Sequence, residues 1–311
     1  MPNSFDSLAE EIKIIVSSHN KRNKVLFLGS YAKNENKFYI NDSKLISLSD
    51  VEFLILGYPN KCLTQELSSI NNKYKLIFGE FFSIDYNYVY PSLRILLLKN
   101  RLLFFEGYKN SNYKIWQFEY VVNKKFDLNE CIQSIIWRLF AVNKKCEDLK
   151  NNNQLLTYFI ARNILDLYMV FSYCEGHRIT KHQDRVDFLK DNDVFNSWFD
   201  KNEMLNVYQL FDKPDDISFD LGLKDFSKVY NSLLLYLKAG DFKILPSKLT
   251  FFKQILITLN FKSLPSLFYN DTSVYNSLER IIKSDFNKNN LRIFVSKFKN
   301  TFIYLNNYNN I

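Results

Sequence analysis

The strongest constraint on this chain is a change in its hydrophobic periodicity near residue 125. Before this point, short apolar runs and alternating apolar and polar residues dominate, after one initial helical stripe. Beyond it, apolar residues recur at three- and four-residue spacing almost to the C-terminus, which is typical of amphipathic helices. We therefore predict an α+β fold, with a mixed sheet and flanking helices over residues 1–125 and an all-helical domain over residues 126–311.

The same patterns predict the individual elements. In the N-terminal domain we expect a helix over 5–19, a strand over 25–28, an irregular loop over 31–47, a strand over 50–56, a helix over 62–72, and strands over 75–89, 102–106 and 113–121. In the C-terminal domain we expect helices over 127–149, 154–174, 183–191, 202–211, 223–239, 247–260, 273–284 and 289–306, with the Lys- and Asn-rich stretch 143–154 as an interhelix loop.

Composition narrows the class of protein. Hydrophobic residues make up 47% of the chain and charged residues 24%, which is typical of a folded protein. The low counts of 7 glycines and 6 prolines argue against a Gly-rich phosphate loop and against an all-β fold rich in tight turns. The net charge of +8 suits an anionic substrate such as a nucleotide, a nucleic acid or an acidic glycan, and a generally basic proteome explains it equally well.

Cysteine spacing and hydropathy indicate the cellular compartment of the protein. The 4 cysteines are widely spaced without a CxxC pair, which favours reduced cytosolic thiols over a zinc site or disulfides. The N-terminus, MPNSFDSLAEEIK, is acidic and polar, unlike a signal peptide. The longest apolar stretch, 155–174, carries Arg162, Asn163 and Asp166, which are costly at a bilayer centre. We therefore predict a buried helix of a soluble cytoplasmic protein with no membrane span.

Three features of the N-terminal domain place polar groups where a metal and a phosphate can be held. Gly29 and Ser30 follow a buried strand, so the backbone turns there and presents N–H groups and a hydroxyl. Asp50 and Glu52, at i and i+2 of a strand, share one face and lie about 7 Å apart. Asp85 lies on the polar face of a later strand that can pair beside the first. Carboxylates of this kind are the ligands that Mg²⁺ prefers.

This arrangement resembles the DNA polymerase β-like nucleotidyltransferase superfamily, whose motif is a hydrophobic strand, Gly-Ser, a spacer, and Asp-x-Asp/Glu on the next strand. The residues that carry the resemblance are VLFLGS (25–30), SDVEFLIL (49–56) and FSIDYNYV (82–89). The resemblance implies that Ser30 contacts the triphosphate and that Asp50 and Glu52 bind metal. It also implies that Asp85 completes the metal site and orients the acceptor hydroxyl.

The spacer from Ser30 to Asp50 is longer than is common in the superfamily. It fits a subgroup often encoded among surface-polysaccharide genes, with a GSYARGEG-like start and an SDYEF-like strand. Here these segments are GSYAKNEN (29–36) and LSDVEF (48–53). Lys33 replaces the usual arginine, which keeps a positive charge at the phosphate, and the following glycines are missing.

The resemblance implies an enzyme with a catalytic N-terminal domain and a helical domain that can close over the active site. It would use two Mg²⁺ ions, or Mn²⁺ in their place, to transfer NMP from an NTP to a hydroxyl or phosphate of a small-molecule, sugar or glycan acceptor, releasing pyrophosphate. Two alternatives stay open: a toxin-type transferase that nucleotidylates protein or tRNA, and a catalytically inactive nucleotide-binding or scaffold protein. Nucleic-acid binding is less favoured, because no RNP-like, KH-like or zinc-knuckle pattern is present.

The helical domain contains secondary candidates. Arg162 and Asp166, four apart in an apolar helix, are interpreted as a partly buried ion pair, with a contact to nucleotide or acceptor as the alternative. A basic cluster follows that helix and is interpreted as solvated surface, with binding of nucleotide phosphates or an anionic acceptor as the alternative. Its members are His177, Arg178, Lys181, His182 and Arg185.

Overall fold

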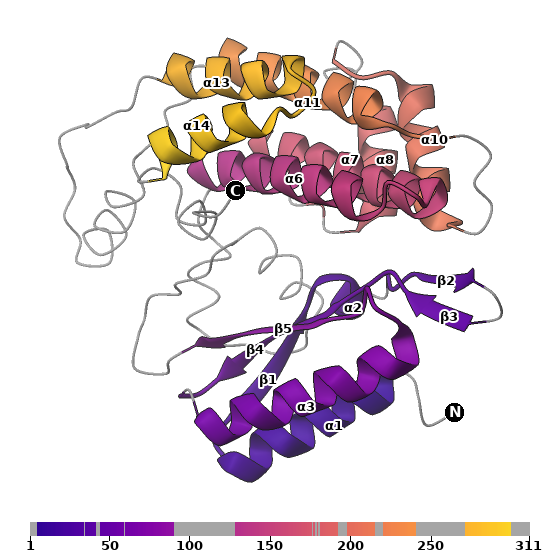
Figure 1. Ribbon diagram of the computed structural model, residues 1–311, viewed down its shortest axis with the longest axis vertical. Helices are drawn as coiled ribbons and strands as arrows, with labels where there is room; N and C mark the ends of the chain where they lie inside the picture. The colour runs from indigo at the N-terminus through magenta and orange to yellow at the C-terminus, as the bar shows by residue number, and fades with distance from the viewer. Residues whose placement is uncertain are drawn as a thin grey trace. The chain divides into compact units, whose positions relative to one another are not determined.

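A computed structural model shows a chain that forms two compact units, Met1–Lys124 and Lys125–Ile311 (Figure 1). The α+β class predicted from the sequence is confirmed, because a small mixed sheet near the N-terminus is followed by helices. The structure describes residues 5–33, 35–41, 44–58, 60–89, 128–175, 177, 179, 181–191, 198–214, 220–240 and 271–299.

The described part of the first unit is built on a three-stranded mixed sheet with the order β1–β4–β5. Strand β1 (Lys24–Leu28) pairs antiparallel with β4 (Val51–Leu56), and β4 pairs parallel with β5 (Ile84–Val89). Two parallel neighbours need a crossover connection, and helix α3 (Lys61–Phe78) supplies it. Helix α1 (Phe5–His19) lies beside α3 along the sheet (Figure 1).

One face of this sheet is apolar and packs on the two helices. Val51, Phe53 and Ile55, alternate residues of β4, are all at most 1% exposed and enter one core with α1 and α3. The helices contribute stripes spaced for a single helical face, namely Phe5, Leu8, Ile12 and Val16 of α1, and Leu63, Leu67, Ile70, Tyr74 and Phe78 of α3. Since successive strand residues point to opposite faces, the residues between these core positions face away from α1 and α3.

Helix α3 is longer than the sequence pattern predicted, and β5 is shorter. The predicted strand over 75–89 is wrong in its first part, because the buried stripe of α3 continues through Tyr74 to Phe78. The helix ends at Gly79, whose φ of 91° lies in the left-handed region that favours glycine. Only Ile84–Val89 forms a strand, and it begins after the buried Phe82 has rejoined the core.

The segment predicted as an irregular loop, residues 31–47, is largely ordered. It contains the end of the short helix α2 (Gly29–Lys33) and a hairpin of β2 (Phe38–Asn41) with β3 (Lys44–Ser47). The prediction was wrong because the hairpin is specified by distant packing. A methyl group added to Gly79 would lie only 3.2 Å from Ile46 of β3, so the hairpin packs closely on the end of α3.

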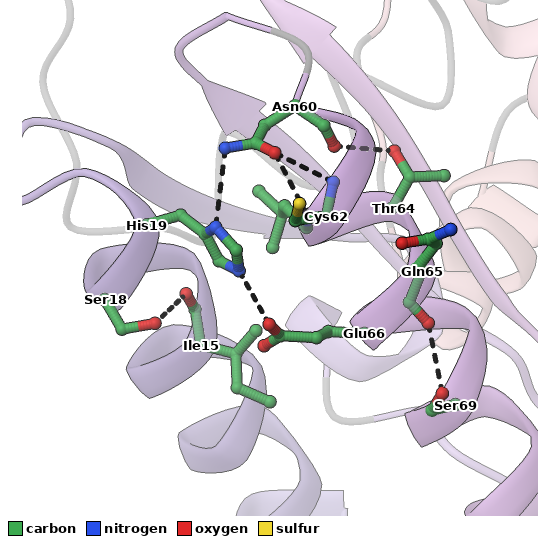
Figure 2. A network of polar contacts seen from close by, with 10 residues as sticks. Ile15, Ser18, His19, Asn60, Cys62, Thr64, Gln65, Glu66 and Ser69 are labelled. Carbon is green, nitrogen blue, oxygen red and sulfur yellow. Dashed lines mark hydrogen bonds and ion pairs between the residues drawn. The ribbon is translucent and has the colours of Figure 1, made fainter.

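His19, the last residue of α1, connects that helix to the start of α3 (Figure 2). Its Nε2 atom lies 3.0 Å from Glu66 Oε1, and its Nδ1 atom lies 3.4 Å from Asn60 Nδ2. Asn60 is the N-cap of α3, and its Oδ1 accepts the N–H groups of Cys62 and Leu63. Because the amide oxygen is committed to the cap, its NH₂ group donates to His19 Nδ1. The imidazole therefore carries its proton on Nε2 and donates it to Glu66.

The described part of the second unit is helical throughout. Its elements are α6 (Leu128–Asp148), α7 (Asn153–Cys174), α8 (His182–Asp191), α10 (Lys201–Asp212), α11 (Leu223–Ala239), α13 (Asp271–Lys283) and α14 (Lys288–Phe298). Helix α7 is central, since α6, α8, α10 and α11 all pack against it. In the described ranges it is the one helix long and apolar enough to cross a membrane, but 89% of its most apolar window is buried by the protein, as predicted for a core helix.

Two predicted boundaries in this unit are corrected. The stretch 143–154 is not a loop for most of its length, because α6 continues to Asp148 and α7 begins at Asn153. Within this extension the Lys145 ammonium lies 4.4 Å from the ring centre of Phe159 on α7, a contact that joins the two helices. Helix α14 ends at Phe298, with Lys299 as its C-cap, so the predicted helix over 289–306 is also too long. The predicted strands over 102–106 and 113–121 and the predicted helix over 247–260 lie outside the described residues.

Candidate functional site

The sheet brings two of the predicted carboxylates side by side. Glu52 of β4 is registered directly against Asp85 of the parallel strand β5. Neighbouring strands lie about 4.8 Å apart, so residues in register on one face are lateral neighbours. Both face away from α1 and α3, because Val51 and Ile84 next to them belong to the apolar core. The alternation predicted for these two strands is confirmed.

The third carboxylate, Asp50, immediately precedes β4 and acts on Asp85 through its charge. Partial desolvation by the surrounding protein raises the pKa of Asp85 most, and the negative charge of Asp50 raises that pKa further. A hydrogen bond from Ser83 and the charge of Lys75 lower the pKa of Asp85, but the net shift is upward. The side chain of Asp85 nevertheless keeps an exposed surface through which a ligand can reach it.

Gly29 joins the predicted phosphate-binding turn to these carboxylates. It follows Leu28, which pairs with Glu52 across β1 and β4, and its φ of 62° is left-handed. A Cβ atom at this position would lie 2.2 Å from Glu52 Oε2, so any other residue here would displace the Glu52 carboxylate. The Gly-Ser turn and the Asp-x-Glu strand, 20 or more residues apart in sequence, therefore meet in space, and the turn leaves room for the Glu52 carboxylate.

The turn continues into α2, where Ser30 is half-buried and its carbonyl accepts the N–H of Glu35 at 2.9 Å. Tyr31 anchors this short helix to α1, since its hydroxyl donates to Asp6 Oδ1 at 3.0 Å. Burial, together with that hydrogen bond, raises the pKa of Tyr31 to about 12, so the hydroxyl stays protonated and remains a donor. The backbone of Lys33 ends α2, and its side chain lies outside the described residues.

A buried pair of serines, which the sequence interpretation missed, leads the chain into Asp50. Ser47 and Ser49 are 0% and 2% exposed. The Ser47 hydroxyl donates to the Ser49 carbonyl at 2.6 Å, and the Ser49 hydroxyl accepts the N–H of Lys37 at 3.0 Å. Buried hydroxyls need such partners, and here they tie the β2–β3 hairpin to the residue before Asp50. The signal in the sequence was the pair of serines in SLSD (47–50).

The donor chemistry of this site fits a divalent cation. Carboxylate oxygens are the hard ligands that Mg²⁺ takes up, and a cation relieves the repulsion between Asp50 and Asp85 that raises the pKa of Asp85. In the ranges that the structure describes, no three His, Cys, Asp or Glu side chains already lie close enough together to hold a metal ion.

The charged residues of the helical unit form a different arrangement around Asp166 of α7. Arg138 of α6 lies 2.9 Å from Asp166 Oδ2, while Arg185 and His182 of α8 lie 3.4 Å and 3.5 Å from Oδ1. All four residues are at most 7% exposed. Burial alone would raise the pKa of Asp166, but Arg138, His182 and Arg185 together hold that pKa well below its usual range.

These contacts correct the interpretation of the basic cluster. His182 and Arg185 were predicted on solvated surface, but they enter the core with Asp166, whereas His177 and Lys181 are exposed. Burial leaves Asp166 and Arg185 without the accessible surface that a nucleotide or acceptor contact needs. Arg162 is half-buried one turn before Asp166 on α7, and Arg178 lies outside the described residues.

The main partner of Asp166 was missed because Arg138 is distant in sequence. Its signal was its position in the apolar run IIWRLF (135–140), where a charged residue on a buried helical face must find an opposite charge.

No family model, no curated protein and no solved structure matches this chain.

Proposed function

We propose that this protein is a Mg²⁺-dependent nucleotidyltransferase. In this reaction NMP passes from an NTP to a hydroxyl or phosphate of a small-molecule, sugar or glycan acceptor, and pyrophosphate is released. The observation that carries the proposal is the registered pair Glu52–Asp85, with Asp50 at the entrance of β4 and Gly29 packed against Glu52. These are the residues, in the same order, that carry the resemblance to the polymerase β-like superfamily.

Each of these residues would have a separate role in the reaction. Asp50, Glu52 and Asp85 would hold the divalent ions, which neutralise the triphosphate and stabilise the leaving pyrophosphate. Ser30 and the backbone N–H groups at the start of α2 would contact the phosphates. An acceptor oxygen would form a bond to the α-phosphorus, while the bond to the bridging oxygen breaks and pyrophosphate leaves with that electron pair. Asp85 would take the acceptor proton.

The proposal is tested with the full chain and each of the four NTPs, with and without Mg²⁺. We expect one NTP to raise the melting temperature only when Mg²⁺ is present. Asp50→Asn should abolish this stabilisation and lower pyrophosphate release about 100-fold or more, as losses of a transition-state charge contact do. Glu80→Gln is the matched control, because Glu80 is an exposed carboxylate in the turn before β5. Full activity in Asp50→Asn would overturn the proposal.

The same protein preparation separates the two alternatives. A toxin-type transferase would label protein or tRNA from a radiolabelled NTP, whereas transfer to a small acceptor would leave macromolecules unlabelled. A catalytically inactive binding protein would bind nucleotide equally with and without Mg²⁺ and would release no pyrophosphate with any acceptor.

A further inference from the structure

Ser83, the residue before β5, contacts both strands that carry the carboxylates. Its carbonyl accepts the N–H of Val51 at 3.0 Å, and Val51 is the residue between Asp50 and Glu52. Its hydroxyl donates to Asp85 Oδ2 at 3.3 Å. Ser83 therefore joins the backbone between Asp50 and Glu52 to the side chain of Asp85.

The backbone around Ser83 is held on the other side by α3. The N–H of Ile84 donates to the Asn71 side-chain oxygen at 2.9 Å, and Phe82 is 0% exposed in the core. Ser83 is thus flanked by a buried ring, a bond to β4 and a bond to α3. The short serine side chain has few rotamers, and in this structure its hydroxyl lies where it donates to Asp85.

We propose that Ser83 is a positioning residue that orients Asp85 for a divalent cation, an inference that rests on the proposed function. The hydroxyl engages Oδ2, which leaves Oδ1 as the oxygen available to a cation on the sheet face that Asp85 shares with Glu52. Outer partners of this kind fix the orientation of metal-binding carboxylates, and their removal typically lowers metal affinity 10- to 100-fold.

The test compares Ser83→Ala with Ser83→Thr in the full chain and measures Mn²⁺ affinity by electron paramagnetic resonance. Alanine removes the hydroxyl and keeps the backbone bond to Val51, so we expect about 10-fold weaker Mn²⁺ binding with an unchanged melting temperature. Threonine keeps the hydroxyl and should bind Mn²⁺ as the wild type does. Ser69→Ala is the matched control, since the exposed Ser69 hydroxyl bonds only its own helix, at the carbonyl of Gln65.

A double-mutant comparison separates positioning of Asp85 from other effects. In an Asp85→Ala background, Ser83→Ala should cause no further loss of Mn²⁺ affinity, because the carboxylate it orients is gone. Two results would overturn the role of Ser83 and leave the proposed function standing. One is a loss of Mn²⁺ affinity on adding Ser83→Ala to Asp85→Ala that equals the loss in the wild-type background. The other is wild-type Mn²⁺ affinity in Ser83→Ala when Asp85→Ala binds Mn²⁺ weakly. Absence of Mn²⁺ binding by the wild-type protein would overturn the metal site itself, and this inference with it.

Discussion

Asp85 in the first unit and Asp166 in the second carry the same side chain in opposite surroundings. Asp85 is exposed and lies close enough to Asp50 for that charge to raise its pKa. Asp166 is buried among two arginines and a histidine, which hold its pKa far below the usual range. Ionisation of Asp85 therefore destabilises the fold, whereas ionisation of Asp166 stabilises it.

This difference separates a structural aspartate from a functional candidate. A buried charge is tolerated only when partners compensate it, so Arg138, Arg185 and His182 bind Asp166 and connect α6, α7 and α8. Repulsion between carboxylates on an accessible face lowers the stability of the fold. Groups with pKa values shifted in this way are found preferentially at functional sites. The contrast leads to four predictions, in order of decreasing effect.

Asp166→Asn should have the largest effect on stability. It leaves the guanidinium groups of Arg138 and Arg185 buried without their carboxylate, and breaking a buried ion pair in this way costs about 3–5 kcal/mol. The free energy of unfolding, measured with urea, checks this value. Asp187→Asn is the control, because Asp187 is half-exposed on α8 and its ion pair with Lys190 is worth about 0–1 kcal/mol. Equal losses in the two variants would remove the distinction between a buried and a surface carboxylate.

Gly29→Ala should have the second largest effect. The added Cβ would meet Glu52 Oε2 at 2.2 Å in a left-handed backbone, whose cost for a residue with a side chain is about 1–2 kcal/mol. We expect that loss in urea unfolding, together with loss of Mn²⁺ binding as Glu52 is displaced. Gly222→Ala is the control, since a Cβ there meets only Asp225 Oδ2 at 3.9 Å. An alanine at position 29 that preserves both stability and Mn²⁺ affinity would contradict the close packing of the turn on Glu52.

The stabilisation of the fold by Asp166 should decrease at low pH. Its folded pKa is lowered, so its stabilisation is complete above the ordinary carboxyl pKa of about 3.9 and is lost as pH falls below that value. The difference in unfolding free energy between the wild type and Asp166→Asn should therefore be large at pH 6 and smaller at pH 3. A difference that stays constant between these two pH values would show that the ionised carboxylate is not what stabilises the bundle.

Asp85→Asn should change the stability of the fold in the opposite direction to Asp166→Asn, and by the smallest amount of the four predictions. The folded pKa of Asp85 is raised, so its ionised form disfavours folding at neutral pH, and this cost disappears as pH falls through the raised pKa. Without divalent cations, the variant should melt at an equal or slightly higher temperature than the wild type at pH 7, and the two curves should converge near pH 4. A lower melting temperature for the variant at pH 7 would show that Asp85 is compensated in the fold, as Asp166 is.

Several features could be predicted because they depend on local spacing. Helices α1 and α7 lie where periodicity predicted them, since an apolar residue every three or four positions defines a helical face within a few turns. Alternation likewise placed Glu52 and Asp85 on the face opposite the core, because successive strand residues always point to opposite faces. Even the error in α3 was local, since the stripe that ends at Phe78 was present in the sequence and was interpreted as a strand.

The sequence by itself thus determined the class of fold, the helical faces and the residues that we propose carry the chemistry. Only the tertiary structure decided which of them meet: Glu52 with Asp85 through strand register, Gly29 with Glu52 through the turn, and Asp166 with Arg138 through helix packing. The physical reason is that register and charge compensation depend on contacts between residues far apart in the chain. Side-chain periodicity assigns a residue to a face, but it does not specify which residue of another strand or helix that residue meets.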